Sequence, residues 1–173
     1  MTESVQRIYP IGTVGTPWGA AEKALWLSQQ PVKRSYQAEV MSPLQQILTA
    51  PALADCAELL SYGTLDYSGH QLGTYPLYAV KSRQFDANKP LLLVTGGVHG
   101  YETSGVQGAL LFIRDHFARY ASIANVLVLP CISPWGYETI NRWNPDAVDP
   151  NRSFVAGGPS QEAHAVLALL SQF

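Results

Sequence analysis

Two short apolar runs separated by a helical pattern constrain the fold of this sequence more than any other feature. Residues 91–95 and 126–130 are continuous apolar runs, as expected of strands buried on both faces of a sheet. Between them, apolar side chains recur at helical spacing from residue 104 to about residue 120. A strand–helix–strand unit of this kind has parallel strands and a right-handed crossover. The sequence therefore predicts an α/β fold with a mainly parallel, mixed sheet and helices on both faces.

Further helices and one further strand are predicted outside this unit. Proline marks several of their limits, because it suits the first turn of a helix and interrupts a helix interior. Pro43 opens one expected helix, and Pro51 separates it from the next. The expected helices cover residues 17–30, 43–50, 52–60 and 160–173, and the expected strand covers residues 76–80.

The composition narrows the classes of partner. Hydrophobic residues make up 47% of the chain and charged residues 14%, which is enough apolar surface for a buried core. A net charge of −2 provides no basic surface, so nucleic acid and anionic membranes are not expected as partners. The first ten residues lack the apolar segment of a signal peptide, and no apolar stretch approaches the ~18 residues of a membrane span. We therefore expect a cytoplasmic protein. Cys131 follows an apolar run and is expected to be buried.

A glycine-rich polar loop follows the first apolar run and carries His99 and Glu102. In open α/β sheets, sites form beyond the carboxyl ends of the strands. An imidazole and a carboxylate are ligands that zinc accepts, and the flanking glycines would let both side chains converge. The alternative is a loop histidine beside a glutamate that interacts with the amino end of the following helix. The residues alone leave these two interpretations open.

A second polar segment follows residues 126–130 and carries Arg142, Asn151 and Arg152. Two arginines and an amide beside a metal would suit an anionic substrate group and a developing oxyanion. The alternative is that the arginines are surface residues paired with Asp146 and Asp149.

Taken together, the two segments resemble the M14 zinc carboxypeptidase superfamily. The resemblance covers about residues 90–170, and the order and spacing of its motifs both fit. The matching pieces are Gly97-Val98-His99-Gly100-Tyr101-Glu102, Ser133-Pro134-Trp135-Gly136-Tyr137-Glu138, Arg142, and Asp149-Pro150-Asn151-Arg152-Ser153-Phe154. One departure is Ser133, which stands where the family usually has asparagine, and it puts the shape of that loop in doubt.

The resemblance implies a role for each matching residue. His99 and Glu102 would be the first two zinc ligands, and Arg142 would stabilise the tetrahedral oxyanion. Asn151 and Arg152 would hold the terminal carboxylate of the substrate. Residues 86–173 would then form the amino-terminal part of a carboxypeptidase-like catalytic domain, with residues 1–85 as an extension packed on it.

The resemblance also implies residues that this sequence does not supply. The family has a third zinc ligand, a histidine on a later strand, and a glutamate base beyond it. The one later histidine, His164, lies off the apolar face of its predicted helix and is expected to face solvent. We therefore expect a fold that is incomplete at the carboxyl end. Its unpaired sheet edge would favour self-association into a homo-oligomer.

Three functions are compatible with these residues. The first is a zinc hydrolase that cleaves an amide bond next to a free carboxylate in a peptide. The second is a deacylase of N-acyl amino acids, of the aspartoacylase and succinylglutamate desuccinylase kind. The third is a binding module that keeps the fold without catalysis.

Overall fold

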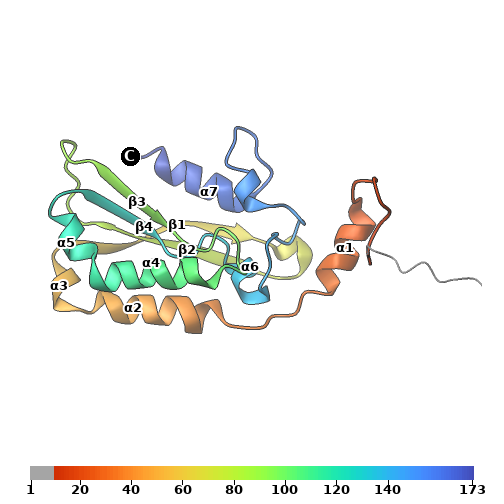
Figure 1. The fold of residues 1–173 in the computed structure, drawn as a ribbon, viewed down its shortest axis with the longest axis horizontal. Coiled ribbons are helices and arrows are strands. Elements are labelled where there is room, and N and C mark those ends of the chain that lie inside the picture. Colours follow the sequence, from red (N-terminus) through yellow and green to blue (C-terminus); the bar gives the residue numbers. More distant parts are fainter. Residues whose placement is uncertain (1–9) are drawn as a thin grey trace, which may run out of the picture. The chain divides into compact units, whose positions relative to one another are not determined.

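The computed structural model describes residues 10–173 (Figure 1). The chain divides into two compact units between Pro31 and Val32. The first contains helix α1, Ala20–Ser28, whose first turn is closed by a hydrogen bond from the Gly19 amide to Glu22 Oε2 (2.9 Å). The helix expected over residues 17–30 is therefore present, and it begins at Ala20.

The second unit alternates helices and strands. A five-residue π-helical turn, Gln37–Met41, leads into its first α-helix, and short 3-10 turns occur at Ser68–His70 and Pro150–Arg152. Its other elements are α2 (Ser42–Leu48), α3 (Pro51–Ala54), β1 (Ala57–Asp66), β2 (Thr74–Ser82), β3 (Leu91–Thr95), α4 (Thr103–Asp115), α5 (Phe117–Ala121), β4 (Asn125–Leu129), α6 (Pro134–Thr139) and α7 (Gln161–Leu170).

The four strands form one mixed sheet in the order β1-β2-β4-β3. β3 and β4 pair in parallel over their whole length, from Leu91 opposite Asn125 to Thr95 opposite Leu129. The pairs β1–β2 and β2–β4 are antiparallel. The predicted parallel strand–helix–strand unit is confirmed. Residues 57–82 belong to the same sheet as β3 and β4. The boundary at residue 85 between an extension and a carboxypeptidase-like catalytic domain stays a prediction.

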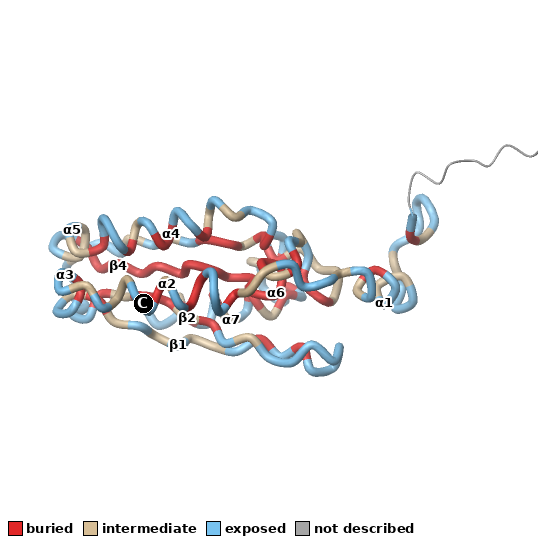
Figure 2. Tube along the Cα trace, turned by 90° about the horizontal axis from the view of Figure 1, so that it is seen from below, coloured by how far each residue is buried: buried red, intermediate tan, exposed pale blue. Residues whose placement is uncertain are grey.

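Helices cover both faces of this sheet. Figure 1 shows α2 and α4 on one face and α7 on the other. Successive side chains of a strand point to opposite faces, so Val126 and Val128 pack in the cluster that contains the α4 side chains. Leu127 and Leu129 pack in a second cluster, which contains Val166 and Leu169 of α7. β4 is thus buried along its whole length (Figure 2).

The helix predicted over residues 52–60 is wrong. Only Pro51–Ala54 form a helical turn, and β1 begins at Ala57. Alanine, leucine and glutamate in this segment have high helix propensity, but propensity is a weak preference that tertiary context overrides. The long antiparallel pairing of β1 with β2, interrupted by a bulge between Ser61 and Gly63, provides the stronger interaction here.

The expectation that residues 91–95 are buried on both faces is also wrong for the described chain. β3 is the last strand of the sheet order, and exposed and half-buried residues alternate along it. Leu91 is 40% exposed and Leu93 is 38% exposed. An edge strand has a neighbour on one side only, so its composition alone does not determine its burial.

The other predicted elements are confirmed. The helix expected from residue 104 is α4 followed by α5, and the strand expected at residues 76–80 is the centre of β2. His164 is exposed on α7, as expected. Cys131 is buried, and burial raises the pKa of its thiol to about 12.

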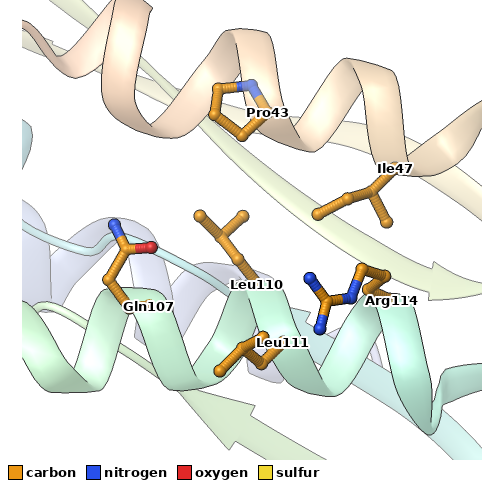
Figure 3. Close-up of a pocket in the computed structure, with 6 residues that line it drawn as sticks. All are labelled: Pro43, Ile47, Gln107, Leu110, Leu111 and Arg114. Carbon is orange, nitrogen blue, oxygen red and sulfur yellow. The ribbon is translucent and has the colours of Figure 1, made fainter.

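A small pocket lies between α2 and α4 (Figure 3). Its volume is about 130 Å³, well below the roughly 300–1,000 Å³ typical of small-molecule sites. It is lined by Pro43, Ile47, Gln107, Leu110, Leu111 and Arg114. None of these residues belongs to the two predicted site loops. Within residues 10–173, no helix combines the length and the apolar character needed to cross a membrane.

Candidate functional site

The loop between β3 and α4 is held against the segment that follows β4. The Gly96 amide donates to Leu129 O (2.8 Å), and the amides of Ile132 and Ser133 donate to Gly96 O (3.1 Å) and Gly97 O (2.9 Å). These bonds extend the β3–β4 pairing past the ends of both strands. Gly97 has a φ of +60°, a backbone conformation that glycine adopts without steric cost. The polar segments that follow the two strands therefore lie side by side.

The same loop approaches α6 closely. A Cβ at Gly100 would overlap the backbone of Gly136, so a side chain at position 100 would separate the two segments. The amide of Tyr101 donates to Asn141 O (3.2 Å), just after the end of α6. A residue without a Cβ is thus required at position 100, next to His99.

His99 and Glu102 come together at the carboxyl end of β3. His99 Nδ1 lies 3.1 Å from Glu102 Oε1, and the Glu102 amide donates to His99 O (3.1 Å) in the intervening turn. The imidazole is buried, whereas the Glu102 side chain is 49% exposed. The predicted approach of these two side chains is confirmed, and one edge of the pair is open to solvent.

Asp149 binds the other nitrogen of His99. Its Oδ1 lies 2.8 Å from His99 Nε2, and its Oδ2 accepts from Arg142 Nε (3.0 Å) and lies 2.9 Å from Arg142 Nη2. Burial alone would raise the pKa of Asp149. The hydrogen bonds from His99, Arg142 and the Asn151 amide outweigh that effect and hold the pKa below its usual value. A carboxylate in this position can fix Nε2 as the protonated nitrogen, which leaves the lone pair of Nδ1 for a metal.

Tyr101 completes this cluster. Its ring stacks on the His99 imidazole, with the planes 6° apart and the centroids 5.8 Å apart. Its hydroxyl accepts from Arg142 Nη1 (3.2 Å). Arg142 is thereby fixed between Asp149 and Tyr101, within the cluster that contains His99. Its side chain is 37% exposed, so part of the guanidinium faces solvent.

Asn151 and Arg152 are exposed and belong to the 3-10 turn that directly follows Asp149. Their proposed contact with a substrate carboxylate stays a prediction. The alternative pairing of arginine with aspartate is partly realised, because Asp149 does bind Arg142. Asp146 instead lies 2.8 Å from His70 Nε2. Although Arg142 is paired with Asp149, it remains in the site, because the Asp149 carboxylate also binds His99.

A buried glutamate anchors the segment that carries Arg142 and Asp149. Glu162 of α7 is 1% exposed and accepts hydrogen bonds from Tyr67 Oη (2.6 Å), Ser160 Oγ (2.6 Å) and Asn144 Nδ2 (3.1 Å). Asn144 Oδ1 in turn accepts from the amides of Asp146 and Val148 (both 3.1 Å). A chain of hydrogen bonds thus connects α7 to the residue next to Asp149.

His99 and Glu102 provide donor atoms that suit two of the ligand positions of a zinc site. The imidazole nitrogen and carboxylate oxygen are zinc ligand types, and their 3.1 Å separation is close to that of two atoms each about 2.0–2.2 Å from one ion. Asp149 supplies the outer-shell carboxylate that metal-binding histidines commonly have. Within residues 10–173, no group of three or more His, Cys, Asp or Glu side chains is arranged to hold a metal. The described residues therefore provide part of a metal site.

Sequence reasoning missed the contacts of three residues. Asp149 could have been found, because it stands two positions before Asn151 inside a motif that had been recognised. Tyr101 lies between the two predicted ligands, which is a weaker signal. Glu162 carried no signal at all, since a glutamate in the first turn of a helix is common on a surface.

Comparisons with known proteins concern the family and the fold of the chain. Residues 35–168 match the family described as "Protein of unknown function (DUF2817)". No match is found among curated protein sequences. Among solved structures, a candidate metallopeptidase from Shewanella baltica shares 24% identity at a TM-score of 0.62, over 76% of this chain and 48% of that one. A candidate metallopeptidase from Shewanella amazonensis shares 24% identity at a TM-score of 0.62, over 83% of this chain and 56% of that one.

A more distant match is a metallo-carboxypeptidase from Burkholderia cenocepacia. It shares 16% identity at a TM-score of 0.58, over 77% of this chain and 37% of that one. The chain thus spans about half the length, or less, of these solved structures. At these identities the matches establish the fold, which is that of the metallo-carboxypeptidases. By the match over most of its length, the chain belongs to the DUF2817 family.

Proposed function

We propose that this chain is part of a zinc-dependent hydrolase of the carboxypeptidase type, which cleaves an amide bond next to a free carboxylate. The observation that carries the proposal is the approach of His99 Nδ1 to Glu102 Oε1 at 3.1 Å, with Asp149 on the opposite nitrogen of the imidazole. This arrangement provides two ligand atoms and the carboxylate that orients one of them. Its position at the carboxyl end of β3 is where sites form in open α/β sheets.

Each residue of the cluster has a role in this proposal. His99 and Glu102 hold the metal, and Asp149 keeps the proton of His99 on Nε2. Bound zinc would acidify a coordinated water and polarise the scissile carbonyl. Arg142, whose guanidinium is fixed by Asp149 and Tyr101 but partly exposed, donates to the oxygen on which negative charge develops.

Substrate binding follows from the next turn of the chain. Asn151 and Arg152 are exposed immediately after Asp149, where an amide and a guanidinium can bind a carboxylate. The proposed substrates are therefore peptides or N-acyl amino acids with a free carboxylate. Catalytic zinc sites take three protein ligands, and residues 10–173 contain no group of three side chains arranged to hold a metal. The proposal therefore requires a third ligand, and it also requires a general base.

Zinc titration tests the metal site directly. The 173-residue chain should bind one zinc ion weakly, and His99→Ala and Glu102→Ala should each weaken binding at least about tenfold, as loss of a ligand at an incomplete site requires. His164→Ala is the matched control and should bind like the unmodified chain. Equal binding by the unmodified chain and His99→Ala would contradict the proposal. Tight one-to-one binding that depends on His164 would show that the site is complete with that histidine.

Hydrolysis is tested on the protein as its gene expresses it, with a panel of peptides and N-acyl amino acids. Release of an amino acid with a free carboxylate, abolished by a chelator and restored by zinc, is the expected result. Arg142→Lys should lower kcat more than it raises KM, because its contact strengthens as charge develops. Activity that persists after complete metal removal would contradict a zinc mechanism.

A further inference from the structure

Arg34 makes an unusual set of contacts at the base of the candidate site. Its Nε donates to Tyr137 O (2.6 Å), Nη1 donates to Thr103 Oγ1 (2.8 Å) and Nη2 donates to Gly100 O (2.7 Å). Its guanidinium carbon also lies 3.5 Å from the centre of the Tyr137 ring. One half-buried side chain from the segment before α2 therefore contacts both loops that form the site.

The acceptors of Arg34 have a specific relation to the predicted ligands. Gly100 directly follows His99, and Thr103 directly follows Glu102 and begins α4. Two donors of one planar guanidinium thus hold the chain just after each ligand. Because the guanidinium is rigid, the two bonds fix the span of the loop between these points.

The third bond of Arg34 connects this loop to α6. Tyr137 O belongs to the helix whose Gly136 is in close contact with Gly100. The guanidinium also stacks on the Tyr137 ring, so Arg34 contacts both the backbone and the side chain of Tyr137. Arg34 therefore binds the loop at two residues, Gly100 and Thr103, and connects it to α6 through Tyr137.

The backbone around Arg34 is itself well held. The amides of Lys33 and Arg34 donate to Glu138 O (2.8 and 3.2 Å), and the Tyr36 amide donates to Glu138 Oε1 (2.8 Å). Glu138 Oε2 accepts from Tyr75 Oη (3.0 Å), which connects this junction to β2. The guanidinium therefore projects from an anchored segment.

We propose that Arg34 is a positioning residue, which sets the geometry of the loop from His99 to Glu102 and through it the separation of the two metal ligands. The part of this statement that concerns metal rests on the proposed function. Lysine cannot replace arginine here, because a single ammonium group cannot direct donors to three acceptors spread around a planar fork.

The test compares Arg34→Lys and Arg34→Ala with the unmodified chain. One readout is amide hydrogen exchange at residues 99–104, with residues 163–169 of α7 as the internal reference. The other is zinc affinity measured by competition with a chelator. Arg119→Lys, at an exposed arginine on α5, is the matched control and should change neither readout.

The expected result for Arg34→Lys is faster exchange at residues 99–104, unchanged exchange in α7, and zinc affinity lowered about tenfold, as for other outer-shell residues. Exchange at residues 99–104 that matches the unmodified chain would overturn the proposal. Faster exchange throughout the chain would overturn it as well, because Arg34 would then be a general structural contact. If Arg34→Ala does not fold, hydrogen exchange and zinc affinity of Arg34→Lys alone test the proposal.

The two proposals fail in different ways. If the unmodified chain binds no zinc, the proposed function fails, while local loosening in Arg34→Lys still supports the positioning of the loop. If zinc binds through His99 and Glu102 but Arg34→Lys retains full affinity and normal exchange, the role of Arg34 is refuted and the metal site stands.

Discussion

The strands β3 and β4 each consist of four aliphatic residues and one polar residue, but their surroundings differ. Each has five residues and ends just before a loop of the candidate site. All five residues of β4 are buried between two layers of helices (Figure 2). In contrast, β3 alternates between exposed and half-buried positions at the edge of the sheet. The difference shows that an apolar run predicts a strand, while the place of that strand in the sheet determines its burial.

The loops after the two strands differ in the contacts that hold them. The segment after β4 leads into the buried network around Glu162. The loop after β3 ends at the half-exposed Glu102 and is held by Arg34 from another segment. The two loops of the candidate site are therefore held by different long-range contacts, a buried glutamate on one side and a half-buried arginine on the other. The predictions below test this contrast.

Replacing a leucine in each strand should give the largest difference. Leu127→Ala in β4 removes a fully buried side chain, and we expect the free energy of unfolding to fall by about 2–5 kcal/mol. Leu93→Ala in β3 should lower it by less than about 1.5 kcal/mol, because the side chain is already partly solvated. Urea unfolding of both variants measures the two losses. Equal losses would mean that β3 is covered in the folded protein.

Two glutamates provide a second contrast. Glu162→Ala leaves the donors of Tyr67, Asn144 and Ser160 without their buried acceptor, which should cost about 1–3 kcal/mol. Glu102→Ala removes a half-exposed carboxylate that contacts His99 Nδ1 and should lower stability by less than about 1 kcal/mol, because the carboxylate is partly solvated. Thermal unfolding compares the two, with Glu162→Gln as a variant that retains an acceptor. A small effect of Glu162→Ala would show that the network does not anchor this side.

Acidification tests the connection between the two loops through Asp149. Its pKa is lowered in the folded state, so the unfolded chain takes up a proton first as the pH falls. The stabilisation is present above the unfolded pKa of about 3.9 and is lost as the pH falls through the lower folded value. Between about pH 6 and pH 3, the unmodified chain should lose more stability than Asp149→Asn, which has no carboxylate to protonate.

Urea unfolding at several pH values measures this difference. Asp115→Asn is the control, because Asp115 is exposed and its contact with Arg114 is screened by solvent. The control should follow the unmodified chain closely. Identical pH profiles for Asp149→Asn and the unmodified chain would show that the carboxylate does not join the loops in solution.

The smallest effect should be self-association at the edge of β3. An exposed apolar edge strand can pair with another copy of itself, so we expect weak, concentration-dependent association of the 173-residue chain. Leu93→Lys should abolish it with little change in stability, because Leu93 is partly exposed. Leu111→Lys, at an exposed leucine on α4, is the control and should associate like the unmodified chain. Sedimentation measures all three, and a strictly monomeric unmodified chain would refute the prediction.

Local patterns in the sequence were enough to predict several of these features. The parallel strand–helix–strand unit follows from the periodicity of residues 91–130, which depends on neighbours along the chain. The approach of His99 to Glu102 follows from their spacing of three residues in a glycine-rich turn. The outward position of His164 follows from the apolar face of its own helix. Each of these features depends on residues close together in the sequence.

The remaining features depend on residues far apart in the sequence. β1 formed in place of a helix because pairing with β2 outweighed local propensity. Asp149 reaches His99 across fifty positions, and Arg34 reaches Gly100 across sixty-six. Periodicity cannot specify such contacts, because they depend on how separate elements pack. The sequence by itself determined the strand–helix–strand unit and one pair of candidate ligands, and the tertiary structure decided which side chains hold that pair in place.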